Sequence, residues 1–121
     1  MLPDSSLDSV KSAKQPGMFV DTGVPALFRA AYELRAKKHR MIISVAGGAE
    51  IMDSGNIFNI GARNYDALNK LCQEHGLRIQ AAQVGGLVNR TMYLNLASGE
   101  VRLKTSGQYQ ESILCKNLTT T

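Results

Sequence analysis

The sequence predicts an α+β (mixed α/β) fold, in which a β-sheet core carries two main helices packed on it and a C-terminal hairpin. Three observations predict it: two stretches with apolar residues spaced by three and four, short apolar stretches that stop at glycine pairs, and a later region of strict alternation. The order helix, strand, helix, strand, hairpin fits helices that cover one side of a sheet. The length of 121 residues suits one domain, residues 1–121.

The first helix is predicted to start at Asp21, with Pro25 tolerated in its first turn. Its apolar stripe is expected to face the core. The stripe consists of Val24, Leu27, Phe28, Ala31 and Leu34. Residues 41–46 are apolar, partly β-branched and followed by Gly47 and Gly48, which indicates a short buried strand.

The second helix is predicted from Asn64, a plausible helix cap, to about Glu74. The glycines and asparagines of residues 53–63 are typical of a loop before it. Gly76 fits the left-handed position just past a helix end. Apolar positions on one face of this helix are Leu68, Leu71 and Cys72.

Alternating apolar and polar residues predict the remaining strands. Residues 77–81 alternate and lead into Val84-Gly85-Gly86, which favours a half-buried strand. Residues 92–96 and 101–103 alternate on either side of a Ser98-Gly99 turn, which indicates a hairpin.

The two ends of the chain show no sustained periodicity. Residues 1–17 are rich in Ser, Lys, Asp and Pro and are expected to form a surface loop, and residues 105–121 a partly ordered tail. The start lacks the pattern of a signal peptide, and no apolar run is long enough to span a bilayer. We therefore expect a cytoplasmic protein without membrane insertion.

Charge and cysteine content restrict the possible ligands. The formal charge is +4, and the densest basic run, residues 35–40, falls where a helix is predicted to end, so a solvated helix terminus is expected and no nucleic-acid partner. Cys72 and Cys115 show neither disulfide-scaffold nor metal-ligand spacing, so no metal and no cofactor are expected. A nucleotide loop at Gly47-Gly48 is a weaker alternative, because neither a Lys-Ser/Thr pair nor a GxGxxG pattern follows.

Several glycine-containing motifs occur in a characteristic order. They are Met1-Leu2-Pro3-Asp4-Ser5, Val45-Ala46-Gly47-Gly48-Ala49, Ile60-Gly61-Ala62-Arg63-Asn64, Val84-Gly85-Gly86, Asn89-Arg90 and Ser98-Gly99-Glu100-Val101. With two helices between them, over residues 1 to about 104, they resemble the CheD family of chemoreceptor glutamine deamidases. Each glycine pair alone serves many turns, but four loops in this order are far more specific. Gln83 and Asn89 depart from the family pattern, which has Asp and Gly there.

The resemblance implies a protein-glutamine amidohydrolase that converts receptor glutamines to glutamate. A cysteine thiolate attacks the carboxamide carbon, a histidine takes and returns the proton, hydrogen-bond donors stabilise the oxyanion and water then hydrolyses the thioester. The implied partners are the cytoplasmic domain of a chemoreceptor and the CheC phosphatase. In the family the Gly-Ser-Cys turn, a threonine and the histidine precede the Leu-Pro segment, so the resemblance places all three before Met1 and no catalytic residue within 1–121.

The residues expected to face substrate belong to the glycine-containing loops. They are Gly47, Gly48, Ala49, Asn64, Gly85, Gly86 and Arg90. Loops that follow strands or begin helices gather at one end of a sheet, so we expect them around one surface depression. The alternative for Asn64 and Arg90 is a purely structural role in loop geometry.

Whether the chain is an enzyme stays open at this stage. It is either a deamidase whose catalytic segment precedes Met1 or a non-catalytic module that binds the receptor or CheC. Cys72 and His75 are three residues apart on a helix, but a thiol on an apolar face near a helix C-terminus favours core packing over catalysis. Cys115 beside Lys116 is better placed as a reactive thiol, without a histidine nearby in sequence.

Overall fold

The computed structural model describes residues 1–50, 59–107 and 111–116. In order, its elements are η1 (Ser5–Leu7), α1 (Ser9–Lys14), η2 (Pro16–Met18), α2 (Val20–Glu33), η3 (Lys38–Arg40), β1 (Ile43–Gly47), α3 (Ile60–Glu74), β2 (Ile79–Val84), β3 (Arg90–Leu94), β4 (Val101–Thr105) and β5 (Ser112–Cys115), where η marks a 3-10 helix. This confirms the predicted α+β class. None of the helices in the described ranges has both the length and the apolar character that a membrane crossing requires.

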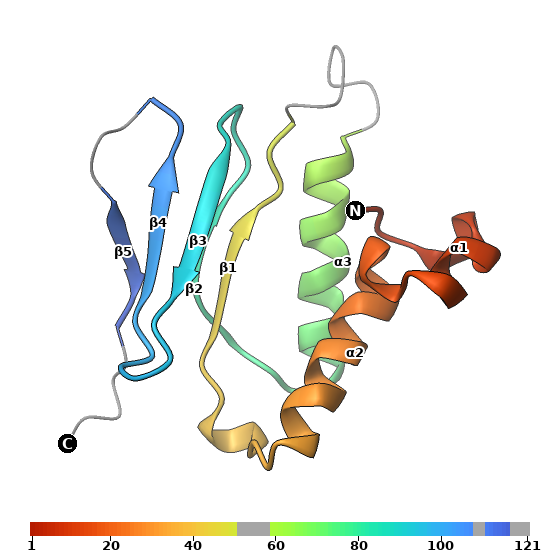
Figure 1. The fold of residues 1–121 in the computed structure, drawn as a ribbon. Coiled ribbons are helices and arrows are strands. Elements are labelled where there is room, and N and C mark those ends of the chain that lie inside the picture. Colours follow the sequence, from red (N-terminus) through yellow and green to blue (C-terminus); the bar gives the residue numbers. More distant parts are fainter. Residues whose placement is uncertain (51–58, 108–110, 117–121) are drawn as a thin grey trace.

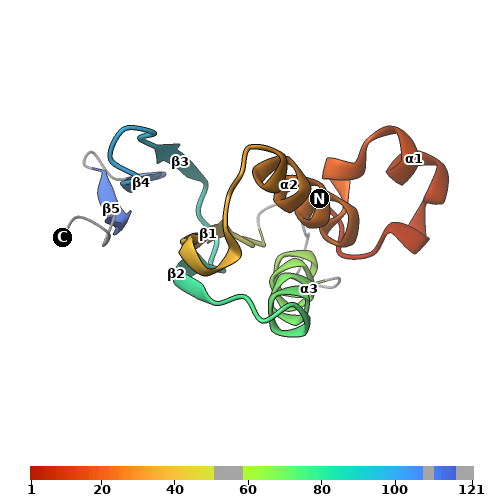
Figure 2. The same cartoon turned by 90° about the horizontal axis from the view of Figure 1, so that it is seen from below.

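The described strands form two sheets rather than the one expected. Strands β1 and β2 pair in parallel, and α3 makes the crossover between them, while β3, β4 and β5 form an antiparallel sheet in that order. Helices α2 and α3 lie on one side of the β1–β2 pair and the three-stranded sheet lies on the other (Figures 1 and 2). Contacts of β1 with β3 and of β2 with β5 join the two sheets.

The N-terminal segment is more ordered than the predicted loop. Short helices occupy much of residues 1–17, and the carboxylates of Asp4 and Asp8 each accept a backbone N–H at the start of one of them. Leu2 forms a parallel bridge with Phe19, whose side chain is fully buried. The segment is thereby fixed against the start of α2.

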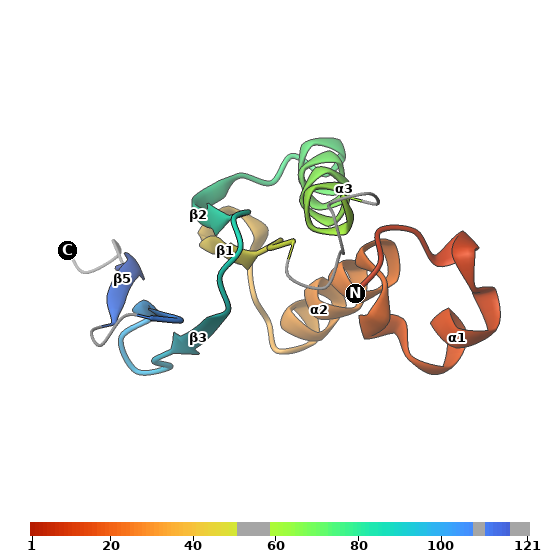
Figure 3. The same ribbon diagram turned by 90° about the horizontal axis from the view of Figure 1, so that it is seen from above.

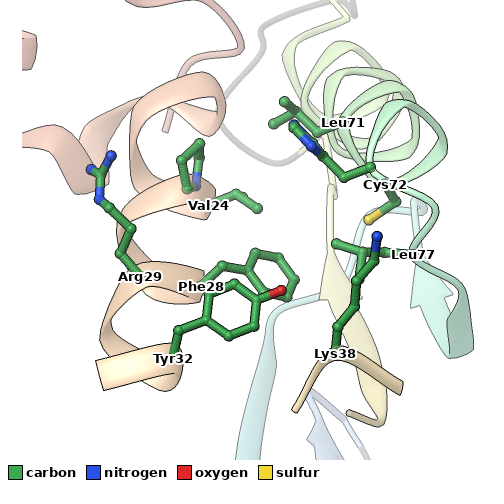
Figure 4. Close-up of a pocket in the computed structure, with 10 residues that line it drawn as sticks. Val24, Phe28, Arg29, Tyr32, Lys38, Leu71, Cys72 and Leu77 are labelled. Atoms are coloured by element: carbon green, nitrogen blue, oxygen red, sulfur yellow. The ribbon is translucent and has the colours of Figure 1, made fainter. Parts of the chain in front are cut away.

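Helix α2 begins one residue before the predicted Asp21, but the predicted core stripe is wrong at two positions. Leu27 is 68% exposed and Leu34 is 85% exposed. Phe28 points toward α3 (Figure 4). Successive residues of a helix point about 100° apart, so Leu27 lies on a different face of α2 and is exposed. Leu34 is the residue that follows the helix end.

Strands β1 and β2 lie close to their predicted positions. The alternation expected for β2 is confirmed, since Ile79 and Ala81 are partly buried and Gln80 is exposed. Strand β1 begins two residues later than predicted, and all of its residues are partly exposed rather than buried.

Helix α3 begins at Ile60, so the prediction that Asn64 caps it is wrong. Asn59, in the left-handed conformation with φ of 51°, takes the cap position, and Asn64 lies within the helix. The loop predicted over residues 53–63 falls outside the described residues up to position 58 and is helical from position 60. At the other end, Gly76 has φ of +65°, which confirms the predicted left-handed residue.

The predicted hairpin is confirmed as β3 and β4, whose register pairs Met92 with Leu103. Leu103 is 1% exposed, whereas Met92 is 43% exposed, so β4 supplies the buried face. The predicted tail over residues 105–121 contains β5, which pairs with β4, so the hairpin is not the last element. The segment is too short for its sequence to show the pairing.

Replacing Gly76 tests the end of α3. A Cβ in the left-handed region costs an L-residue roughly 1 kcal/mol, so Gly76→Ala is expected to lower the free energy of unfolding by about that amount. Gly76→Asn should lose less, because asparagine adopts this conformation more readily. Urea unfolding of both variants measures the difference, and equal losses would contradict the assignment.

Candidate functional site

Two glycine-containing loops meet where β1 and β2 end. We call residues 47–49 and 85–86 the glycine loops. Because β1 and β2 are parallel, both loops leave the same edge of the sheet (Figure 3). The Gly85 N–H donates to the Gly47 carbonyl at 2.9 Å, and the Glu50 N–H donates to the Gly86 carbonyl at 3.0 Å. The two loops are therefore held together by backbone hydrogen bonds.

The start of α3 packs directly against the first glycine loop. A Cβ on Gly61 would overlap the Gly48 carbonyl oxygen, so only glycine fits at this point of the helix. Glu50 lies beside it, and its Oε1 accepts the backbone N–H of Ala62 at 2.9 Å. A carboxylate is favoured there because the N-terminal end of a helix carries partial positive charge.

Asn64 connects α3 to the first residue of the chain. Its Nδ2 donates to the Met1 carbonyl at 3.0 Å. This contact places the Leu-Pro segment beside the glycine loops, where a pocket of about 340 Å³ opens. The pocket is lined by Met1, Leu2, Gly48, Ala49, Glu50, Ile60, Gly61 and Asn64. We refer to it as the Met1 pocket.

Arg90 clamps the glycine loops from β3. Its Nη1 donates to the Gly47 carbonyl at 3.1 Å and its Nη2 to the Gly85 carbonyl at 2.8 Å. Its Nε donates to Gln83 Oε1 at 3.2 Å. One guanidinium group thus binds the ends of both strands, which its planar set of donors allows and a lysine would not.

The structure brings all seven predicted site residues to one edge of the domain, but they do not surround the single surface depression expected, because the residues other than Gly86 line three separate hollows. Gly48 lines both the Met1 pocket and a second hollow of about 180 Å³ that also contains Gly85. Gly47, Ala49 and Arg90 line a third hollow of about 190 Å³. Gly86 joins the group through the hydrogen bond from Glu50.

Comparison of the sequence with known proteins identifies the family of the chain. The sequence model described as CheD chemotactic sensory transduction matches residues 1–105. The chain belongs to the CheD family. A protein named probable chemoreceptor glutamine deamidase CheD 1, from Syntrophus aciditrophicus, is 47% identical over 107 residues, which cover 88% of this chain and 67% of that protein.

Two further relatives carry similar names. The probable chemoreceptor glutamine deamidase CheD of Solibacter usitatus is 39% identical over 113 residues, with 93% of this chain and 67% of the relative covered. The probable chemoreceptor glutamine deamidase CheD 2 of Anaeromyxobacter dehalogenans is 36% identical over 107 residues, with 88% and 67% covered. The family resemblance seen in the loops therefore extends over nearly the whole chain.

Neither cysteine of the chain lies in the glycine-loop site. Cys72 is 3% exposed on α3, and burial raises the pKa of its thiol, which opposes formation of a nucleophilic thiolate. Among the described residues, no hydrogen bond joins Cys72 to His75. Cys115 lies on β5 and its thiol donates to the Lys116 carbonyl at 3.5 Å.

The sequence did not single out two residues that organise this site. Gly61 stands in the Ile-Gly-x-Arg-Asn motif and Glu50 directly follows Gly-Gly-Ala. Their position inside or beside family motifs was the available signal. Their contacts with each other and with the Gly48 carbonyl arise only when β1 and α3 come together.

Replacing Gly61 by alanine tests the close approach. Because the added methyl group would overlap the Gly48 carbonyl, Gly61→Ala should lower the free energy of unfolding by about 1–3 kcal/mol. Gly17→Ala is the matched control, since its new methyl group meets no atom within 4 Å, and should change stability by less than about 0.5 kcal/mol. Thermal or urea unfolding that gave both variants the same stability would rule out the packing described.

Replacing Arg90 by lysine tests the clamp. A single ammonium group cannot reproduce the three hydrogen bonds, so Arg90→Lys should cost about 1–2 kcal/mol and speed amide exchange at Gly85. Arg78→Lys serves as the control, because Arg78 is exposed and its side chain makes no hydrogen bond within the described residues. Unchanged exchange at Gly85 in Arg90→Lys would argue against the clamp.

Proposed function

We propose that this protein acts in chemoreceptor glutamine deamidation and that the glycine loops and the Met1 pocket form part of the surface that receives the receptor segment. The observation that carries this proposal is the Met1 pocket itself, in which Met1 and Leu2 lie beside the first glycine loop and Asn64. In the family the catalytic histidine comes just before the Leu-Pro segment, so this pocket adjoins the place where that histidine enters.

The proposed role of each site residue follows from its contacts. The glycine loops carry no side chain at four positions, which lets a substrate backbone approach closely. Arg90 and Asn64 act as positioning residues, because both hold backbone carbonyls. They fix the loops in the geometry that a glutamine side chain would meet, and this preorganisation supports the attack of a nucleophile.

The nucleophile is proposed to come from the family's Gly-Ser-Cys segment and not from residues 1–121. Attack on a carboxamide needs a thiolate and a base within hydrogen-bond reach, close to donors for the oxyanion. Cys72 is buried in a different pocket with a raised thiol pKa, and Cys115 lies on β5. Neither cysteine combines reactivity with the glycine-loop position.

A second candidate function is a non-catalytic module that binds the receptor or the CheC phosphatase. It is supported by the lining of the Met1 pocket, which contains no cysteine among the described residues. A binding surface needs shape and hydrogen-bond partners, which the loops supply, and does not need the thiolate. The two candidates predict different results when the family's catalytic segment is present, because only the deamidase would then convert receptor glutamines to glutamate.

We expect purified 121-residue chain to leave receptor glutamines unchanged while still binding receptor fragments. Loss of a nucleophile or its base reduces an enzymatic rate by several orders of magnitude. Mass spectrometry of receptor cytoplasmic fragments measures the conversion of glutamine to glutamate, and the matched sample is the chain extended before Met1 with the catalytic segment of a family member. Conversion by the extended chain supports the deamidase, and binding without conversion by both chains supports the module.

The two cysteines provide the contradicting outcome. Conversion by the 121-residue chain that disappears in Cys72→Ala or Cys115→Ala would show that one of these thiols performs the chemistry. Absence of both binding and conversion, in chains with cooperative thermal unfolding, would contradict the proposed receptor surface.

A further inference from the structure

A second pocket lies between α2, η3 and the C-terminal end of α3 (Figure 4). We call it the α2–α3 pocket, and its volume is about 230 Å³. Most of its wall is apolar. The apolar wall consists of Val24, Pro25, Phe28, Leu71, Cys72 and Leu77.

The size of the α2–α3 pocket matches one side chain. A cavity of roughly 150 Å³ holds a benzene ring, whereas pockets for cofactors and drug-sized ligands usually exceed roughly 300 Å³. At about 230 Å³, the pocket has room for a phenylalanine, leucine or methionine side chain with little left over. Phe28 and Leu71 face it from opposite helices, so an inserted side chain would contact both (Figure 4).

The rim of the pocket is basic. Lys38 reaches from η3 toward Cys72 and Leu77, and Arg29 lies on the outer side of α2 (Figure 4). His75, the residue that follows the end of α3, also lines the pocket. Within residues 1–50, 59–107 and 111–116, none of these three side chains forms an ion pair. The adjoining run 35–40 adds further positive charge. Positive side chains such as Lys38 are favoured near the carbonyl end of a helix, but no carboxylate of the described residues pairs with Lys38 or Arg29.

We propose that the α2–α3 pocket docks an acidic peptide segment of a partner protein, which inserts one aromatic or aliphatic side chain and places carboxylates near Lys38 and Arg29. The apolar wall would surround the inserted side chain. Lys38 and Arg29, which form no ion pair with any residue that the structure describes, would attract the carboxylates of the peptide.

This docking site is separate from the glycine loops. Glycine-loop contacts gather at Gly61 and Asn64, in the first turns of α3, whereas Leu71 and Cys72 lie near its last turn. A helix of 15 residues is roughly 20 Å long, so one occupant cannot fill both sites with a short segment. The inference therefore does not depend on the function proposed for the loops.

The test uses fluorescein-labelled peptides and fluorescence anisotropy with the full 121-residue chain. The probe is a nine-residue peptide of glutamates and aspartates with one central phenylalanine, compared with the same peptide carrying alanine at the centre and with a lysine-rich peptide carrying phenylalanine. The acidic phenylalanine peptide is expected to bind. The alanine peptide should bind about 10- to 100-fold more weakly, and the lysine-rich peptide should not bind measurably. Raising the salt concentration should weaken binding of the acidic peptide.

Charge-reversal variants locate the site. Lys38→Glu and Arg29→Glu are each expected to weaken the acidic peptide by about fivefold to tenfold. Lys104→Glu is the matched control, because it makes the same charge change at an exposed residue of β4 and should alter binding by less than about twofold. Thermal unfolding of each variant checks that the fold is retained.

Three outcomes would overturn the proposal. Equal weakening by Lys104→Glu would show non-specific attraction to a basic protein. Equal binding of the phenylalanine and alanine peptides would show that no side chain inserts into the pocket. Binding of free 3-phenylpropanoate as strongly as the peptide would identify the pocket as a site for a small amphipathic carboxylate.

Discussion

The close approach between the Gly48 carbonyl and Gly61 is the constraint on which the glycine-loop site depends. It brings the end of β1 and the start of α3 into backbone contact, which a single methyl group at Gly61 would prevent. Once they are in contact, the Glu50 carboxylate can accept the Ala62 N–H, and Glu50 can donate its own N–H to Gly86. Three chain segments far apart in the sequence are thereby held together at one edge of the β1–β2 pair.

Two side chains extend this arrangement over long sequence distances. Arg90 links β3 to the carbonyls of both glycine loops, and Asn64 links α3 to the Met1 carbonyl. Hydrogen bonds from a charged donor to carbonyls contribute more than neutral ones when they are shielded from water, and those of Arg90 are partly buried. The site is therefore assembled from polar contacts between loops, while the apolar packing lies elsewhere, at Phe19 and Leu103.

Local patterns were enough to predict the features that local physics determines. Alternation predicted β2 and the β3–β4 hairpin, and the glycine after an amphipathic stretch predicted the left-handed residue at position 76. The errors occur where tertiary contacts decide. Asparagine is a common residue at a helix cap, which favoured a start at Asn64. The helix instead begins at Ile60, where Gly61 packs on Gly48. Strand β5 exists because β4 offers it an edge, and four residues cannot show that in sequence.

The same distinction applies to the site. Motif order selected seven loop residues that the structure places near one another, although each glycine pair alone serves many turns. It could not show that Arg90 donates to the carbonyls of Gly47 and Gly85, since that contact spans 43 residues in one direction and five in the other. A carbonyl held by a guanidinium group is a positioning contact, and its geometry argues for loops built to keep one shape. Loops of fixed shape do not depend on a thiolate for their geometry, so the structure of this site and any chemistry performed beside it can be studied separately.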